Sequence, residues 1–371
     1  MRLLCLYFCC AFFLVSCASV ISTKKTPIEV AILMPMEGQH ALQGQRLNRL
    51  IQIGLEDLKT DRISISSYDE SSSASIAEAK NAIIKKNTKI ILGPLFSSNI
   101  PSIEDLPRKY GMIILTLSNN PLVARENEIF VFGHTPLKQI DLLINHLSRS
   151  HRDFVILAPK TNSTENLLKA ITEMIDKNGA KVLANQTYEA HKEDIIASIT
   201  KISEVVDSSL EDEDNNSKPV IIIMEENPEK IRMIFDEIIN QNLSTKATLA
   251  GDSRIDVEYD QPISLILSTS KRKASLELIQ QASDGYSAAA SLNQLENLAY
   301  DLGTLVADAI GTDDTNFSGK DFRENFLAKI YTSSWYAGLS SDFRFEDAVA
   351  QRRYSIILRE DNEYKVLEIA N

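Results

Sequence analysis

The stretch VAILMPMEGQHALQGQRLNRLIQIGLEDL, residues 30–58, places a short apolar run directly before an amphipathic helical pattern. Residues 28–34 are nearly all apolar, which is typical of a strand that is buried on both faces. In 41–59, leucine and isoleucine recur at helical spacing and form one apolar stripe. A buried strand followed at once by a helix is the repeating unit of a parallel α/β sheet.

The same alternation repeats along most of the 371 residues. Further strands are predicted at 62–67, 89–92 and 111–117, with helices at 74–86 and 98–109. A second set comprises a helix at 137–149, a strand at 153–158, a helix at 163–178, a strand at 180–188, a helix at 190–206, a strand at 219–224, a helix at 228–241 and a strand at 246–250. A strand at 263–268 and helices at 272–282 and 292–310 follow, and 343–345, 352–359 and 363–369 resemble antiparallel strands. Two sets of similar size predict an α/β protein of two doubly wound βα lobes.

The amino terminus has the pattern of an export signal. After Arg2, residues 3–16 (LLCLYFCCAFFLVS) form an apolar run that is shorter than the roughly 20 residues of a membrane-spanning helix. Leu14-Val15-Ser16-Cys17 resembles the lipobox of bacterial lipoproteins. The resemblance implies a signal peptide at 1–16, a lipid on the Cys17 thiol and a lipidated tether at 17–27. An ordinary secretory signal or an N-terminal anchor helix is the alternative.

That lipobox implies a protein of the bacterial cell envelope, anchored in the membrane by lipid and facing the periplasm. Ala18, rather than Asp, follows the cysteine, and this slightly favours the outer membrane.

Composition and motifs exclude several kinds of function. The four cysteines lie at or before Cys17, so the rest of the chain has no thiol nucleophile or thiolate metal ligand. With 39 Lys+Arg against 51 Asp+Glu, the acid excess argues against a nucleic-acid surface. No glycine-rich phosphate loop, H-E-x-x-H motif or nucleophile elbow occurs. We therefore expect no enzymatic activity, no cofactor and no metal.

Two further groups of residues have ordinary explanations. The five histidines share no helix face, and we expect them at the surface. The acidic stretch 204–218 is predicted to be a flexible loop. A calcium-binding loop in this stretch would begin at Asp212. Its sixth position would then be Ser217 instead of Gly and its twelfth Ile223 instead of Glu, so the ligand set is incomplete.

Polar loops follow two of the strands in the first set. Gly93-Pro94-Leu95-Phe96-Ser97-Ser98 follows the third strand, and Ser118-Asn119 follows the fourth. Ligands of open α/β sheets bind at the carboxyl ends of the strands, where free N–H groups at a helix start favour an anion. Ordinary turn and N-cap chemistry is the alternative.

Those loops are also the basis of a family resemblance. Residues 30–58, residues 90–120 and Leu298-Ala299-Tyr300-Asp301 are similar to signatures of the type I periplasmic solute-binding proteins, the branched-chain amino-acid-binding family. The resemblance implies a two-lobed clamp joined by three hinge crossings. Lobe 1 would comprise 28–136 and 262–335, and lobe 2 would comprise 137–261 and 336–371.

The resemblance also implies a ligand cleft between the lobes. Ser97 and Ser98 match the first-lobe serine that binds an amino-acid carboxylate, Ser118 and Asn119 match the next loop, and Asp252 lies near the acidic ligand position. In the second lobe, the family's Tyr-Gly pair is replaced by residues 159–163 (PKTNS), which include no aromatic side chain.

Within this fold, one branch is a better match. GPLFSS (93–98), LSNN (117–120), FGHTP (132–136) and GLSSDFRFEDAVAQRR (338–353) are similar to the penicillin-binding-protein activator lipoproteins. This similarity implies a non-enzymatic regulator that contacts a penicillin-binding protein in peptidoglycan synthesis. The alternatives are a substrate-binding lipoprotein, with an ABC permease and an amino acid or similar small polar ligand as its partners, and an envelope enzyme.

Overall fold

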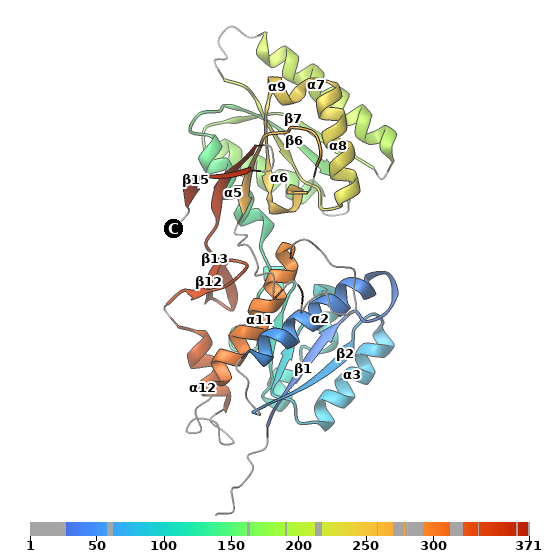
Figure 1. Ribbon diagram of the computed structural model, residues 1–371, viewed down its shortest axis with the longest axis vertical. Helices are drawn as coiled ribbons and strands as arrows, with labels where there is room; N and C mark the ends of the chain where they lie inside the picture. Colours follow the sequence, from blue (N-terminus) through green and yellow to red (C-terminus); the bar gives the residue numbers. More distant parts are fainter. Residues whose placement is uncertain are drawn as a thin grey trace, which may run out of the picture.

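The computed structural model describes residues 27–371 except 58–61, 162–163, 190, 212–216, 258, 270–277, 279, 281–291, 312–321, 333, 361–362 and 370–371. The signal peptide at 1–16, Cys17 and most of the tether therefore lie outside the described residues, as does most of the helix expected at 272–282. The remainder forms two α/β lobes stacked along the long axis of the molecule (Figure 1).

The lower lobe in Figure 1 is built on an eight-stranded sheet with the order β11-β12-β13-β5-β4-β3-β1-β2. Neighbours from β13 to β2 run parallel, and β11–β12–β13 is antiparallel. The strands are β1 (Ile28–Met34), β2 (Ile63–Asp69), β3 (Ile90–Leu92), β4 (Ile113–Thr116), β5 (Ile129–Val131), β11 (Tyr336–Ala337), β12 (Asp342–Glu346) and β13 (Val349–Arg352).

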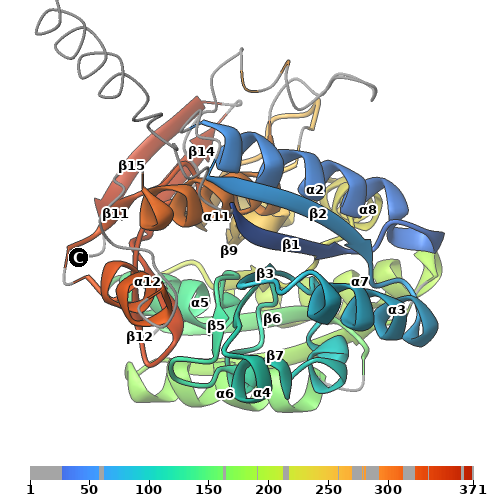
Figure 2. The ribbon, with the colours of Figure 1, turned by 90° about the horizontal axis from the view of Figure 1, so that it is seen from below.

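Helices cover both faces of this sheet. On one face, α2 (Ala41–Glu56) lies side by side with α11 (Gln294–Ile310), as Figure 2 shows from below, and α12 (Phe322–Ile330) packs into the same apolar core. The other face is covered by α3 (Ser73–Lys85), η2 (Ser97–Ser102) and α4 (Leu106–Tyr110). The short helices η1 (Gly38–His40) and η3 (Pro121–Val123) follow β1 and β4.

The upper lobe repeats this plan. Its seven strands have the order β15-β14-β10-β9-β8-β6-β7, with five parallel strands and an antiparallel pair at the edge. The strands are β6 (Asp153–Pro159), β7 (Lys181–Tyr188), β8 (Val220–Ile223), β9 (Thr248–Asp252), β10 (Leu265–Thr269), β14 (Ser355–Glu360) and β15 (Glu363–Ile369).

The helices of the upper lobe also lie on two faces. α5 (Pro136–Leu147) and α6 (Thr164–Lys177) pack on one face, and α7 (Lys192–Leu210) and α8 (Pro228–Asn240) pack on the other. α9 (Leu243–Lys246) and η4 (Ser253–Ile255) flank β9. In both lobes the second strand lies outside the first and the third lies inside it, as in other doubly wound sheets. The predicted fold class of two doubly wound lobes is therefore confirmed.

The strand order corrects the expected lobe boundaries. β10 belongs to the upper sheet, so the second crossing follows Thr269 and does not lie at 262. β11, β12 and β13 belong to the lower sheet, so the third crossing is at Arg353–Tyr354 and not at 336. The expected strand 352–359 is in fact two strands of different sheets, because the chain passes between the lobes within it.

The acidic stretch is also partly helical. α7 continues to Leu210, so residues 204–210 are not the loop that the sequence predicts. Residues 212–216, including the calcium-loop positions Asp212, Asp214 and Asn216, lie outside the described residues. Among the described residues, no helix combines the length and the apolar character needed to cross a membrane.

Candidate functional site

In the lower lobe, two neighbouring carboxylates hold the loops at the carboxyl ends of β1 and β3. Asp69 ends β2 and accepts a hydrogen bond of 2.7 Å from the Met36 amide. Glu70 accepts bonds of 2.6 Å from the Leu95 amide and 2.8 Å from Asn99 Nδ2. The Glu70 carboxylate thus accepts from a free N–H group two residues before η2, close to where the sequence predicts a ligand's anion.

Burial strongly affects the protonation of Glu70. Its side chain is almost completely buried, and this burial raises its pKa to about 7, although the bonds from Asn99 and Leu95 oppose the shift. The neighbouring Asp69 has a lowered pKa because the Ser71 hydroxyl and the Met36 amide donate to it, and these bonds outweigh its desolvation. Glu70 is therefore a titratable support of the η2 loop.

The four predicted polar residues of the lower lobe lie at the ends of β3 and β4. Ser97 begins η2 and is half-buried, and Ser98 is exposed. Ser118 is buried, and its hydroxyl accepts a bond of 3.1 Å from the Asn120 amide, while Asn119 is exposed. Because β3 and β4 are adjacent parallel strands, both loops lie at one edge of the sheet. The Ser118 hydroxyl is hydrogen-bonded within its own turn, which is what we expect if this loop is an ordinary turn.

The predicted acid of the upper lobe already has an ionic partner. Asp252 ends β9, is buried, and accepts from Nε of Arg254 with both oxygens at 2.9 Å and from Nη2 at 2.6 Å. Nη1 of Arg254 lies 3.7 Å from Glu226, whose side chain is exposed. Arg254 was not among the predicted site residues, although it lies only two residues after Asp252.

The neighbouring acid of this lobe is also engaged. Glu225 is buried and accepts from the amides of Glu226 and Asn227 and, at 2.5 Å, from the Tyr188 hydroxyl. Burial and this bond to Glu225 raise the pKa of Tyr188. Glu225 therefore supports the turn after β8.

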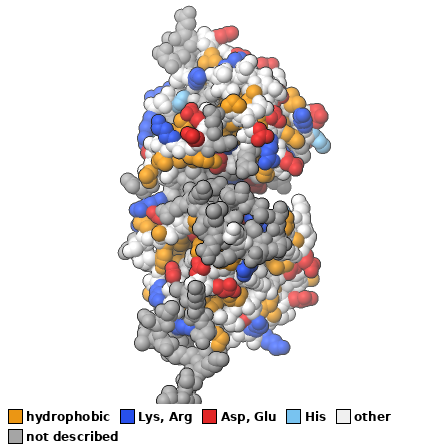
Figure 3. Space-filling model, in the orientation of Figure 1, with side chains coloured by type: hydrophobic (Ala, Val, Ile, Leu, Met, Phe, Trp, Pro, Cys, Tyr) orange, Lys and Arg blue, Asp and Glu red, His pale blue; other side chains and the backbone are white. Residues whose placement is uncertain are grey.

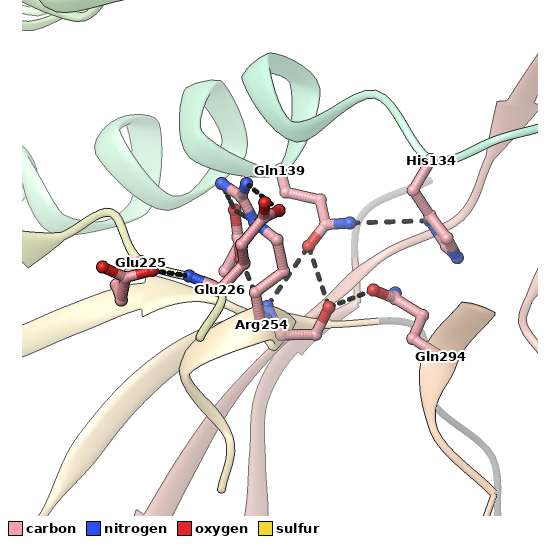
Figure 4. Close-up of polar contacts among 8 residues, drawn as sticks. His134, Gln139, Glu225, Glu226, Arg254 and Gln294 are labelled. Atoms are coloured by element: carbon pink, nitrogen blue, oxygen red, sulfur yellow. Dashed lines mark hydrogen bonds and ion pairs between the residues drawn. The ribbon is translucent and has the colours of Figure 1, made fainter. Parts of the chain in front are cut away.

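A polar link joins the two lobes beside this arginine. Ser253, from η4 of the upper lobe, donates to Gln294 Oε1 at the start of α11 in the lower lobe, and its hydroxyl lies 3.4 Å from Gln139 Oε1. Gln139 Nε2 lies 3.5 Å from His134 Nδ1, which is also 3.2 Å from the Tyr354 hydroxyl. Figure 4 shows this chain from Gln294 to His134.

His134 corrects the expectation of a surface histidine, since it is buried where the first crossing leaves β5. Burial and the nearby Arg352 guanidinium hold its pKa well below its usual range. His134 is therefore neutral at pH 7, and in the tautomer with the proton on Nε2 its Nδ1 can accept from the Tyr354 hydroxyl or from Gln139.

Two sequence signatures from distant parts of the chain meet in the lower lobe. The Asp301 carboxylate on α11 accepts from the amides of Leu339 at 2.6 Å and Ser340 at 2.7 Å. Buried Arg352 donates at 3.1 Å to the hydroxyls of Ser340 and Ser341 and also donates to the Phe132 carbonyl. A Cβ on Gly338 would lie 2.6 Å from Asp301 Oδ2, so this glycine permits a close approach.

The comparisons with known proteins agree with this architecture. A family model described as "LppC putative lipoprotein" matches residues 18–250. The chain belongs to this family. The family is that of the penicillin-binding-protein activator lipoproteins, so the resemblance seen in the sequence is confirmed. The chain is 33% identical over 367 residues, 97% of its length and 95% of the relative's, to the uncharacterized protein RP748 of Rickettsia prowazekii.

Solved structures show the fold alone, because their sequence identities are low. An ABC transporter substrate-binding protein from Sphaerobacter thermophilus has a TM-score of 0.72 at 12% identity, covering 93% of this chain and 97% of its own. The leucine-binding protein LivK of Thermotoga maritima has a TM-score of 0.63 at 16% identity, and the match covers 93% of this chain and 99% of LivK. A solute-binding protein of R. palustris in complex with 4-hydroxybenzoate has a TM-score of 0.68 at 15% identity, and the match covers 93% of this chain and 97% of that protein. The LppC chain therefore has the fold of type I periplasmic binding proteins.

Neither the family nor these neighbours are described as enzymes. Within the described residues, no three His, Cys, Asp or Glu side chains are grouped so as to hold a metal ion.

Proposed function

We propose that this LppC protein is a non-enzymatic regulator of a penicillin-binding protein, and that it acts through protein contacts in the bacterial cell envelope. The observation that carries the proposal is the pairing of Asp252 with Arg254. A receptor for amino acids needs an acceptor for the ligand's ammonium group, and both oxygens of Asp252 already accept from the guanidinium at 2.6–2.9 Å. A ligand would have to displace a bidentate, charge-assisted pair that is mostly shielded from water.

Polar side chains in the loops after β2 and β6 also have partners within the chain. Glu70 accepts from the amide before η2, and Thr164, after β6, donates to the Pro159 carbonyl and accepts from the Thr161 amide. Lys160 in that loop pairs with Glu189 at 2.9 Å. These contacts stabilise the loops without a ligand, which supports a scaffold for protein contacts over a transport receptor.

The location belongs to the same proposal. The match of the family model begins at residue 18, directly after the cysteine of the lipobox-like sequence. We propose that Cys17 carries the lipid and that the two lobes face the periplasm, with the outer membrane favoured. The partner, a penicillin-binding protein, would then be reached from the membrane side.

Capture of a partner by the full chain tests the regulator. We expect the full chain in detergent to capture a class A penicillin-binding protein from the same organism and to change its rate of glycan polymerisation. An unrelated lipoprotein of similar charge, treated identically, is the control. Capture without any change in polymerisation would contradict the regulatory role.

Ligand binding tests the importer alternative. A ligand that binds only the folded state raises the melting temperature by mass action. We expect no saturable rise with any common amino acid. A saturable rise with one of them, together with failure to capture a penicillin-binding protein, would contradict the proposal and favour the substrate-binding lipoprotein.

A further inference from the structure

The strand β15 leaves an unusual surface on the upper lobe. It ends the order of the upper sheet, so its outer side has no strand partner among the described residues. Tyr364, Val366, Leu367 and Ile369 are 54%, 56%, 38% and 65% exposed. Figure 3 shows hydrophobic side chains at the lower left of the upper lobe, where Figure 1 places β15. An apolar edge strand of this kind is a template for pairing with another chain.

The two faces of β15 differ in chemistry. The register with β14 pairs Tyr364, Val366 and Ile369 with Arg359, Ile357 and Ser355, so these three residues share one face of the sheet. Glu363, Lys365 and Glu368 share the other face, because a bulge at Leu367 shifts the alternation. The strand is therefore apolar on one face and carries charges of both signs on the other.

The charged face is fixed in place by α5 and the turn after it. Glu368 Oε2 lies 2.6 Å from His146 Nδ1, and Arg149 donates to the two carboxylate oxygens at 2.8 and 3.1 Å. These contacts lower the pKa of Glu368. A carboxylate can accept about four bonds, so it has room for one further donor.

We propose that two copies of the chain pair through β15, antiparallel about a two-fold axis between Val366 and Leu367, so that the upper sheets of both copies become continuous. In this register Lys365 lies opposite Glu368 of the second copy, on the charged face. Tyr364 lies opposite Ile369 of the second copy, on the apolar face. Each pair occurs twice, as a two-fold interface requires.

Charge complementarity and apolar contact together select this register. An axis at Tyr364 would also place Lys365 opposite a glutamate, Glu363, but would leave Ile369 without an apolar residue opposite it. Moving the axis to Lys365 would place two lysines directly opposite each other, which destabilises an antiparallel pair. Moving the axis by half a residue, from between Val366 and Leu367 onto either of them, would pair side chains that point to opposite faces of the sheet. The proposed register avoids these faults and brings the exposed apolar side chains of the two copies into contact with each other. This inference does not depend on the proposed function.

Sedimentation velocity of the full chain in detergent tests the dimer. We expect a dimer whose dissociation constant rises roughly tenfold or more in Val366→Asp, because an apolar contact is replaced by a charge at the axis. Met233→Asp is the matched control, since Met233 is an exposed apolar residue on α8 and should leave the dimer intact. A monomer, or a dimer that survives Val366→Asp, overturns the proposal. A monomer that binds a different protein through β15 also overturns it.

Disulfide formation tests the register. Residues directly opposite each other have Cβ atoms about 4.5–5.5 Å apart, so the double variant Tyr364→Cys/Ile369→Cys should form a covalent dimer on mild oxidation. Each single variant should not, because its two copies would lie about 17 Å apart along the strands. The wild-type chain is the control, because any covalent dimer that it forms must come from its natural cysteines. Efficient linkage in the single variants, or none in the double variant, overturns the register.

Discussion

Arg254 and Asp252 form a partly shielded ion pair at the carboxyl end of β9, with 29% and 3% of their side chains exposed. Removing the arginine alone leaves a buried carboxylate without its counter-ion. We expect Arg254→Ala to lower the free energy of unfolding by roughly 3 kcal/mol, measured by urea denaturation.

The matched control removes the charge of the acid as well. In Asp252→Asn/Arg254→Ala, the amide oxygen can still accept from the residue 254 amide, as Asp252 does at 2.9 Å. We expect the double variant to recover most of the lost stability. A double variant as unstable as the single one would show that side-chain packing, and not the pairing of charges, sets the stability here.

Glu70 makes a second residue-level prediction, which concerns pH. Its pKa is raised from 4.5 to about 7 in the folded protein, so between these values the folded state binds this proton more tightly than the unfolded state does. The free energy of unfolding should therefore fall as the pH rises through this range, by at most about 1.4 kcal/mol per pH unit. We expect Glu70→Gln to remove this fall in melting experiments from pH 5 to pH 8.

The neighbouring acid is the control for that experiment. Asp69 has a pKa lowered below 3.8, so its own contribution changes only at more acidic pH. Asp69→Asn should keep a fall between pH 5 and pH 8, somewhat smaller than that of the wild type, because the Asp69 charge contributes to the raised pKa of Glu70. If Glu70→Gln keeps this fall too, the titration of Glu70 does not control the stability of the η2 loop.

At the scale of elements, α11 and the β11–β12 hairpin are joined through Asp301 and Gly338. A methyl group on Gly338 would lie 2.6 Å from both Asp301 Oδ2 and the Ser341 carbonyl oxygen. We expect Gly338→Ala to cost about 1–3 kcal/mol of stability. Gly111→Ala is the comparison for backbone strain alone, because its methyl group would meet nothing within 4 Å while its φ of +70° is unfavourable for alanine. A Gly338→Ala variant as stable as the wild type would contradict the close approach.

Buried strands were the elements that the sequence predicted best. The apolar runs at 28–34 and 153–158 correspond to β1 and β6, because a strand buried on both faces is apolar throughout. β5 (Ile129–Val131) and α12 (Phe322–Ile330) were missed. The strand at 352–359 was wrong because continuous β-pattern residues do not reveal where a chain leaves one sheet for another.

The candidate site was predicted only in part for a related reason. The loops of Ser97 and Ser118 follow β3 and β4, which local sequence could indicate. Which acid pairs with which base depends on side-chain direction and on distant contacts. The sequence therefore gave no sign that Arg254 engages Asp252, or that His134 meets Tyr354, 220 positions away.

For the whole molecule, attachment to the membrane is the first prediction. We expect Cys17→Ala to remain an unprocessed precursor that carries no lipid, as judged by labelling with a radioactive fatty acid and by its larger apparent mass. Cys10→Ala is the matched control and should be processed and labelled normally. Lipid labelling that persists in Cys17→Ala would contradict the assignment of the anchor.

The relation between the two lobes provides the last prediction. Ser253 and Gln294 link η4 of the upper lobe to α11 of the lower lobe, and a hydrogen bond of this kind contributes about 1 kcal/mol. Removing it with Gln294→Ala should enrich conformations with separated lobes about fivefold, since each 1.4 kcal/mol changes a population ratio tenfold. Spin labels on cysteines placed at the exposed residues Glu78 and Lys169, one in each lobe, would measure the distance distribution. Glu193→Ala, at an exposed site on α7, is the control and should leave the distribution unchanged. If Gln294→Ala also leaves it unchanged, the lobes are held by the three crossings themselves and not by this polar link.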